Sequence, residues 1–151
     1  MKKIDNPLHT AFPDVSSSCS LEAIGYLFDL DRQGVLQIMS ITGWKRKKDG
    51  YDGATTLQIK RALRLLCAIK KKTIKYTQVK WGIKVSQFAK THRKGVYLLD
   101  MEYHLCILKN GVLVDGWNST HWEIDNGYWE LVDKYPRVRA PQCDSVYSLA
   151  A

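Results

Sequence analysis

The sequence predicts a single α+β domain in which N-terminal helices pack on a C-terminal antiparallel sheet. Apolar residues recur at helical spacing through the earlier part of the chain, and short apolar runs separated by turns fill the later part. The pattern changes from one kind to the other near Val96. Helices followed by strands are typical of an α+β fold, whereas a parallel α/β fold would alternate them.

The size of the chain suits one domain. It has 151 residues, of which 45% are hydrophobic, enough to form a buried core. We expect the domain to span residues 1–135, beginning with an extended lead-in at 1–15 and followed by a loosely attached arm at 136–151. No run of about 18 apolar residues is present, so no membrane span is predicted. The start lacks the apolar stretch of a signal peptide.

Three helices are predicted from their start signals. Ser16–Ser18 supply N-cap hydroxyls for a helix from about 19 to 29. Asp31 can cap a second helix over 32–42. Thr55 and Gln58 fit a capping box that begins a third helix reaching about Ile69. The candidates for the buried side of this third helix are Leu57, Ile59, Leu63, Leu66 and Cys67.

The later elements are shorter. The segment "KTIKYTQV" resembles a strand, and "VSQFAKTH" predicts a short helix that ends before Gly95. Strands are then predicted at "VYLLDM", "YHLCILK", "VLVDGW" and "YWELVD", since all four are rich in β-branched and aromatic residues. Asn110-Gly111 is a two-residue turn signal that joins the second and third of these strands.

The cysteines indicate a reduced environment. They are widely spaced and form no C-x-x-C pair, which favours free thiols over a disulfide framework. The four are Cys19, Cys67, Cys106 and Cys143.

The chain is basic, with a net charge of +8 and a pI of about 9.3. Much of the charge lies at Lys45–Lys48 and in residues 69–84. We interpret these clusters as solvated surface. Nucleic-acid binding is the alternative, but no helix-turn-helix, zinc finger or base-stacking module is recognisable.

Cys19 is a candidate nucleophile. It lies at the predicted start of a helix, where free backbone N–H groups and the macrodipole favour negative charge. A thiol in that position loses its proton more easily, and the thiolate is the reactive form. A buried cysteine that simply begins a helix is the plainer interpretation.

The predicted hairpin supplies a matching histidine and acid. With Asn110-Gly111 as the loop, Lys109 pairs with Val112, and His104 and Asp115 become diagonal neighbours on one face. An aspartate bonded to one imidazole nitrogen leaves the other nitrogen free for a thiol. Trp117 falls opposite His104 in this register and could shield the pair from water.

Other residues compete for these roles. Asn118 is the alternative to Asp115 as the third member, if a bulge at Gly116 turns it to the same face. His9, His92 and His121 lie in the lead-in or in turns and are weaker candidates for the base. No metal site is predicted, because no second ligand pair follows Cys106 and His104 at metal spacing.

In this order, the residues resemble those of papain-like cysteine peptidases. A cysteine opens the first helix, a histidine lies on a later strand, and Asp or Asn lies on the strand after it. More narrowly, "FAKTHRKGVYLLDMEYHLCILKNGVLVDGWNS" resembles the C-terminal half of small papain-like proteins encoded by tailed phages and their bacterial hosts. The likeness covers about residues 15–120.

The resemblance implies a cysteine peptidase or amidase with Cys19 as nucleophile, His104 as base and acid, and Asp115 as orienting acid, without a cofactor. It implies a peptide or protein substrate and a location in the host cytoplasm or in the virion. Papains carry an oxyanion-hole glutamine six residues before the cysteine, where this chain has Pro13. Ser17 and Ser18 are the candidate replacement donors. An inactive papain-like protein that binds a virion or host protein is the alternative function.

Overall fold

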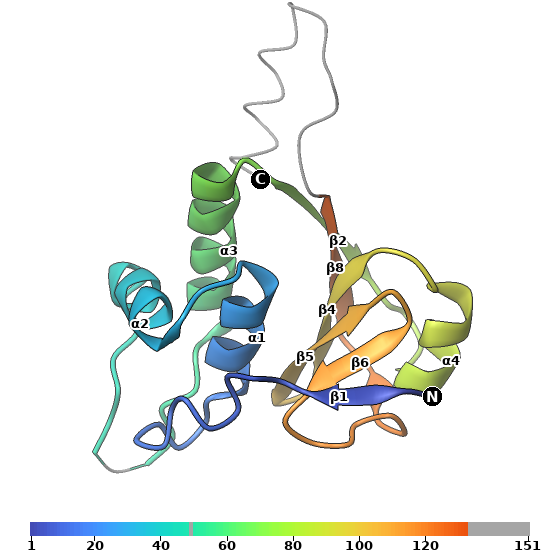
Figure 1. Cartoon of the computed structure of the whole chain (residues 1–151), viewed down its shortest axis with the longest axis horizontal. Coiled ribbons are helices and arrows are strands. Elements are labelled where there is room, and N and C mark those ends of the chain that lie inside the picture. Colours follow the sequence, from blue (N-terminus) through green and yellow to red (C-terminus); the bar gives the residue numbers. More distant parts are fainter. Residues whose placement is uncertain (49, 133–151) are drawn as a thin grey trace, which may run out of the picture.

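The computed structural model describes residues 1–48 and 50–132. It confirms the α+β class. Within these residues, the fold contains four helices, a mainly antiparallel six-stranded sheet and a small two-stranded sheet (Figure 1). The helices are α1 (Cys19–Leu27), α2 (Arg32–Ile41), α3 (Thr56–Lys70) and α4 (Val85–Thr91). The predicted C-terminal arm at 136–151 lies outside the described residues, as does Cys143.

The strands form one large and one small sheet. They are β1 (Lys3–Asp5), β2 (Thr73–Gln78), β3 (Ile83–Lys84), β4 (Val96–Met101), β5 (His104–Lys109), β6 (Val112–Asp115), β7 (Glu123–Ile124) and β8 (Gly127–Val132). The large sheet has the order β1-β6-β5-β4-β8-β2, and β3 pairs with β7 in the small one. All pairs are antiparallel except β1 with β6.

The helix starts follow the predicted caps in two of three cases. The Asp31 side chain accepts from the Gly34 N–H at the start of α2, and Thr55 and Gln58 form a complete capping box on α3. At α1, Ser18 is the N-cap residue, but its hydroxyl bonds to the Glu22 carboxylate instead of the backbone. The hydroxyl donates its proton to the carboxylate, a strong acceptor, and it accepts no hydrogen bond from the N–H groups of the first turn.

Most of the predicted buried side of α3 is confirmed. Ile59, Leu63, Leu66 and Cys67 are buried. Leu57 was a wrong prediction, since it is 56% exposed. It is the second residue of the helix, and it precedes the stripe that the i, i+4, i+7 spacing from Ile59 defines.

The first 15 residues are more than a lead-in. Residues 3–5 form β1, which pairs in parallel with β6 at the edge of the sheet. Phe12 and Val15 are buried in the hydrophobic core. The segment therefore adds an edge strand beside β6 and then supplies two core side chains before α1 begins.

The β5–β6 hairpin has the predicted register. Asn110 and Gly111 both have positive φ, 50° and 79°, as a two-residue hairpin loop requires. Lys109 pairs with Val112 and Ile107 with Val114. The β5–β6 pairing ends at Ile107 with Val114, and β6 ends at Asp115, so Trp117 lies beyond the strand and does not pair with His104 in the ladder as predicted.

The large sheet has an apolar core on each face. Figure 1 shows α1, α2 and α3 on one side of the sheet and α4 on the other. Leu105 and Ile107 of β5 belong to the cluster that includes the α1–α3 side chains, and Cys106 and Leu108 belong to the cluster with α4. The strand is therefore buried on both faces. Among the described helices, none combines the length and apolar character needed to cross a membrane.

Candidate active site

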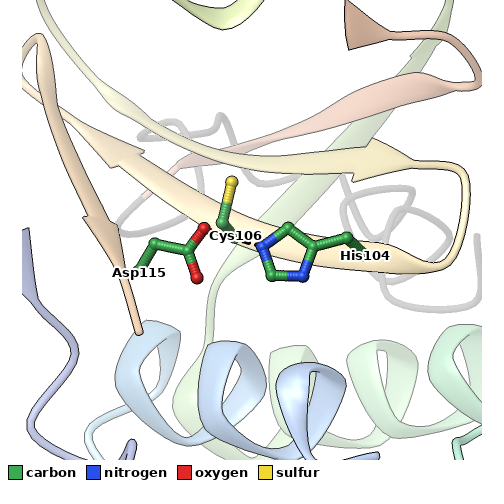
Figure 2. Close-up of side chains that lie close together, drawn as sticks. All are labelled: His104, Cys106 and Asp115. Carbon is green, nitrogen blue, oxygen red and sulfur yellow. Dashed lines mark hydrogen bonds and ion pairs between the residues drawn. The ribbon is translucent and has the colours of Figure 1, made fainter. Parts of the chain in front are cut away.

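The His104 and Asp115 side chains meet at one end of the hairpin. His104 begins β5 and Asp115 ends β6, and Nε2 of the imidazole lies 2.7 Å from Oδ2 of the carboxylate. Figure 2 shows the ring and the carboxylate turned toward each other across the two strands. Both side chains are almost fully buried, with 2% and 5% exposure. The diagonal pairing expected from the hairpin register is therefore confirmed.

Two tryptophans cover the His104 ring. Trp117 stacks on it, with ring centroids 5.2 Å apart and planes inclined by 8°. Trp122 meets it edge-on at 5.1 Å. Both tryptophans are partly exposed, whereas the His104 side chain that they cover is almost fully buried. The two indole rings therefore lie between the imidazole and the solvent. The shielding expected of Trp117 is present, and Trp122 adds to it.

The charge of the imidazole is set by its neighbours. Burial alone would lower the pKa of His104, but the hydrogen bond that the ring donates to Asp115 and the adjacent Cys19 side chain outweigh it and raise the pKa to about 9. Ser119 donates a second hydrogen bond to the same Asp115 oxygen, at 2.6 Å. The carboxylate is thus fixed from two sides, and the ring is held protonated at neutral pH.

Cys19 lies at the open side of the ring. It is the first residue of α1, and its side chain is partly buried. Its interaction with the imidazole contributes to the raised pKa of His104. Among the described residues, Nδ1 of His104 has no well-aligned hydrogen-bond partner, although it is buried. Since Nε2 faces Asp115, Nδ1 is the nitrogen available to the thiol, with the loose geometry common in unliganded sites.

A second cysteine, Cys106, also lies close to the pair. One potential ligand atom each from His104, Cys106 and Asp115 lies within 4.8 Å of the others. Figure 2 shows the three side chains gathered between the two strands. Cys106 is 1% exposed, and burial raises the pKa of its thiol well above the usual value. Burial also raises the pKa of Cys67, to about 11. These two thiols stay protonated and closed to solvent, which leaves Cys19 as the accessible one of the three described cysteines.

Within this group, His104 is hydrogen-bonded to Asp115, and Cys106 contacts the Ser119 hydroxyl, which is itself bonded to Asp115. Ligand atoms around one zinc ion stand about 3.3 Å apart, given bond lengths near 2.0 Å. Nε2 of His104 and Oδ2 of Asp115 are closer than that, at 2.7 Å. Because Cys106 also remains a thiol, the chemistry that this group supports best is proton transfer.

The remaining candidates fall into different places. Asn118 is exposed, and its side chain accepts from the backbone and hydroxyl of Thr120, so Asp115 and not Asn118 is the residue beside His104. The Ser18 hydroxyl is bound to Glu22 at 2.5 Å. Ser17 lies in the walls of both cavities at Cys19, and its backbone N–H donates to Asp52.

Sequence reasoning missed three contributors to the site. Ser119 and Trp122 follow β6 in an irregular segment, where no periodicity fixes the direction of a side chain. The third is a pair formed by His9 and the buried Glu22, whose Nδ1 and Oε1 atoms lie 3.1 Å apart. Glu22 offered one signal, since it is an acid in the first turn of the predicted helix and stands three residues after Cys19, which places the two side chains next to each other on the helix.

A cleft of about 340 Å³ opens beside Cys19 and His104. Tyr51 and Tyr103 contribute to its walls and are strongly exposed, at 60% and 84%. A smaller cavity of about 110 Å³ lies on the other flank of Cys19, toward His9 and Trp117. The thiol is therefore open to a ligand from two sides.

Among the described residues, none from the two basic clusters lines this cleft. Lys45–Lys48 are exposed in the loop after α2. Lys75 is exposed on β2, an edge strand of the large sheet.

Comparisons with family models, curated proteins and solved structures found no match to this chain.

Proposed function

We propose that the chain is a cysteine hydrolase of the peptidase or amidase type that uses Cys19, His104 and Asp115. The observation that carries the proposal is the buried His104–Asp115 pair with its second ring nitrogen left for Cys19. The same arrangement of nucleophile, base and orienting acid recurs on unrelated folds.

The reaction proceeds in two steps. The Cys19 thiolate attacks a carbonyl carbon, forming an S–C bond while the C=O electron pair moves to oxygen. When that intermediate collapses, the bond to the leaving amine breaks and the His104 imidazolium gives it a proton. Neutral His104 then takes a proton from water, which attacks the thioester and releases the acid and the thiol.

Asp115 and the tryptophans support these steps. Asp115 fixes the ring orientation and favours the imidazolium that pairs with the thiolate. Trp117 and Trp122 exclude water from the ring, which strengthens both interactions. The exposed Tyr51 and Tyr103 offer flat apolar surface along the cleft, which suits an extended peptide.

The resemblance noted in the sequence extends the proposal. It favours a phage-encoded enzyme that acts on a peptide or protein, in the host cytoplasm or from within the virion. An inactive binding protein of the same fold is the competing function, and the following experiment separates the two.

The test is alkylation of the full chain with iodoacetamide at pH 7, mapped by peptide mass spectrometry. We expect Cys19 to react faster than N-acetylcysteine, while Cys67 and Cys106 are protected by burial. His104→Gln should slow the alkylation of Cys19 by at least tenfold, whereas the control His121→Gln, at an exposed histidine, should leave the alkylation rate unchanged. A Cys19 that reacts no faster than the model thiol would remove the activated nucleophile and favour the binding protein.

A further inference from the structure

The smaller cavity beside Cys19 contains a second histidine–carboxylate pair. His9 and Glu22 line the smaller cavity together with Cys19 and His104. Glu22 is on α1, one turn after Cys19, and its side chain is 8% exposed. A buried carboxylate so close to a thiolate would oppose its negative charge, unless a cation compensates for it.

His9 is placed to provide that cation. Its Nδ1 lies 3.1 Å from Oε1 of Glu22, while the Ser18 hydroxyl donates to the other carboxylate oxygen. No hydrogen bond in the described residues uses Nε2 of His9, and the side chain is 40% exposed. In the imidazolium form, Nδ1–H is held by Glu22 and Nε2–H remains as a free donor.

The position of His9 is fixed by the turn that follows β1. Asn6 is 4% exposed and bonds through its side chain to the Glu22 carbonyl and the Leu8 N–H. Its backbone N–H donates to the Asp115 carbonyl, and its carbonyl accepts from the His9 N–H. One buried residue thus ties the turn to both α1 and the end of β6.

Gly116 allows the ring to approach. A Cβ atom added at Gly116 would lie 2.0 Å from Nδ1 of His9, a separation that real atoms do not adopt. The glycine follows Asp115 directly, so the His9 ring packs beside the end of the strand that carries the orienting acid. Glycine is the residue that permits such an approach.

We propose that His9, paired with the buried Glu22 carboxylate, is the side-chain donor that stabilises the oxyanion formed when Cys19 attacks a carbonyl. This role rests on the proposed hydrolase function. His9 donates a hydrogen bond from Nε2–H to the negatively charged oxygen and transfers no proton. It takes the place that the missing glutamine leaves open, and the backbone N–H of Cys19 is the second donor. A preorganised donor of this kind contributes about 10²–10³ in rate.

The experiment compares two reactions of Cys19 in the same variants. Acylation by p-nitrophenyl acetate passes through an oxyanion, whereas alkylation by iodoacetamide does not. We expect His9→Ala to slow the acylation burst by about 10²-fold and to slow alkylation by much less, because the thiolate then faces Glu22 without that cation but is still paired with His104. His9→Gln should recover part of the acylation rate, because its amide can donate. His121→Ala, at an exposed histidine, is the matched control and should change neither rate.

A second variant tests the same role without altering His9. Gly116→Ala should displace the ring and reproduce the acylation defect, with alkylation again serving as the control for the His104–Cys19 pair. Equal acylation rates for wild type and His9→Ala would overturn the role of His9 but not the proposed hydrolase function. A loss of the acylation and alkylation rates by the same factor would do the same. If wild type is alkylated rapidly but never acylated, the proposed hydrolase and the role of His9 are both wrong.

Discussion

At His104, burial and hydrogen bonding act on one proton in opposite directions. Removing an imidazole from water favours its neutral form, whereas a buried carboxylate at 2.7 Å favours the charged form. The balance raises the pKa to about 9. The hydrogen bond prevails because Asp115 is also buried and is held in place by Ser119, so little reorganisation accompanies it.

We therefore expect His104 to titrate near pH 9 in the wild-type protein. Asp115→Asn should lower that pKa by at least one unit, since the amide neither carries the charge nor accepts as strongly. The measurement is an NMR titration of the histidine ring protons, assigned by loss of one signal in His104→Gln. A wild-type His104 that titrates near 6.5 would contradict the coupling to Asp115.

Residue-level expectations from sequence held where a regular element fixed the side-chain direction. His104 and Asp115 could be paired because the Asn110-Gly111 turn sets the register and strands alternate faces. The contact between His9 and Glu22 could not be predicted from the sequence, because it depends on how an irregular turn packs against α1. Local sequence carries no periodic signal for such a contact.

At the scale of elements, Asp52 holds the segment that leads into α1. Its carboxylate is 2% exposed and accepts from the Ser16 N–H, the Ser16 hydroxyl and the Ser17 N–H. Burial alone would raise the pKa of Asp52, but these hydrogen bonds outweigh it and lower the pKa. A loop between α2 and α3 thus positions the start of the helix that carries Cys19.

Asp52→Asn should loosen this attachment. The amide turns a donor toward backbone N–H groups, so we expect a loss of about 1–3 kcal/mol in the free energy of unfolding, measured by urea denaturation. Alkylation of Cys19 should also slow, since the thiol no longer sits firmly against His104. Asp29→Asn is the control, because Asp29 is exposed and its φ of 56° suits asparagine. Identical stability in both variants would refute the anchoring role.

The elements that sequence predicted well are those with local determinants. The capping box at Thr55 and the Asn110-Gly111 turn each lie within a few residues and define their element directly. Strand β1 was missed, since three residues paired in parallel with a strand far along the chain leave no pattern of their own. Its partner is chosen by tertiary packing around Asn6, which no local propensity reports.

At the scale of the whole molecule, the position of the large sheet between two apolar cores limits where charged side chains can lie. Both faces of the central strands are covered, so basic side chains gather on loops and edges. Lys75 on the edge strand β2 illustrates this. Exposed lysines on an edge strand discourage pairing with other chains, which gives the basic character a structural reason that is independent of nucleic acid.

The buried site also makes the stability of the whole fold depend on pH. The pKa of His104 is about 9 in the folded protein, against 6.5 for the free side chain. The folded state therefore binds the extra proton between these values, and its stabilisation is fully present below pH 6.5 and lost as pH rises through 9. At 1.36 kcal/mol per unit of pKa, the difference corresponds to a loss of about 3 kcal/mol.

Urea unfolding between pH 6 and pH 9.5 measures this loss. In the wild-type protein, we expect the free energy of unfolding to fall across that range. In Asp115→Asn the fall should be much smaller, because the pKa of His104 in the folded state then lies closer to its unfolded value. His121→Gln, at an exposed histidine, should follow the wild type. Parallel curves for wild type and Asp115→Asn would show that the proton on His104 is not linked to folding, and would remove the electrostatic basis proposed for the thiolate at Cys19.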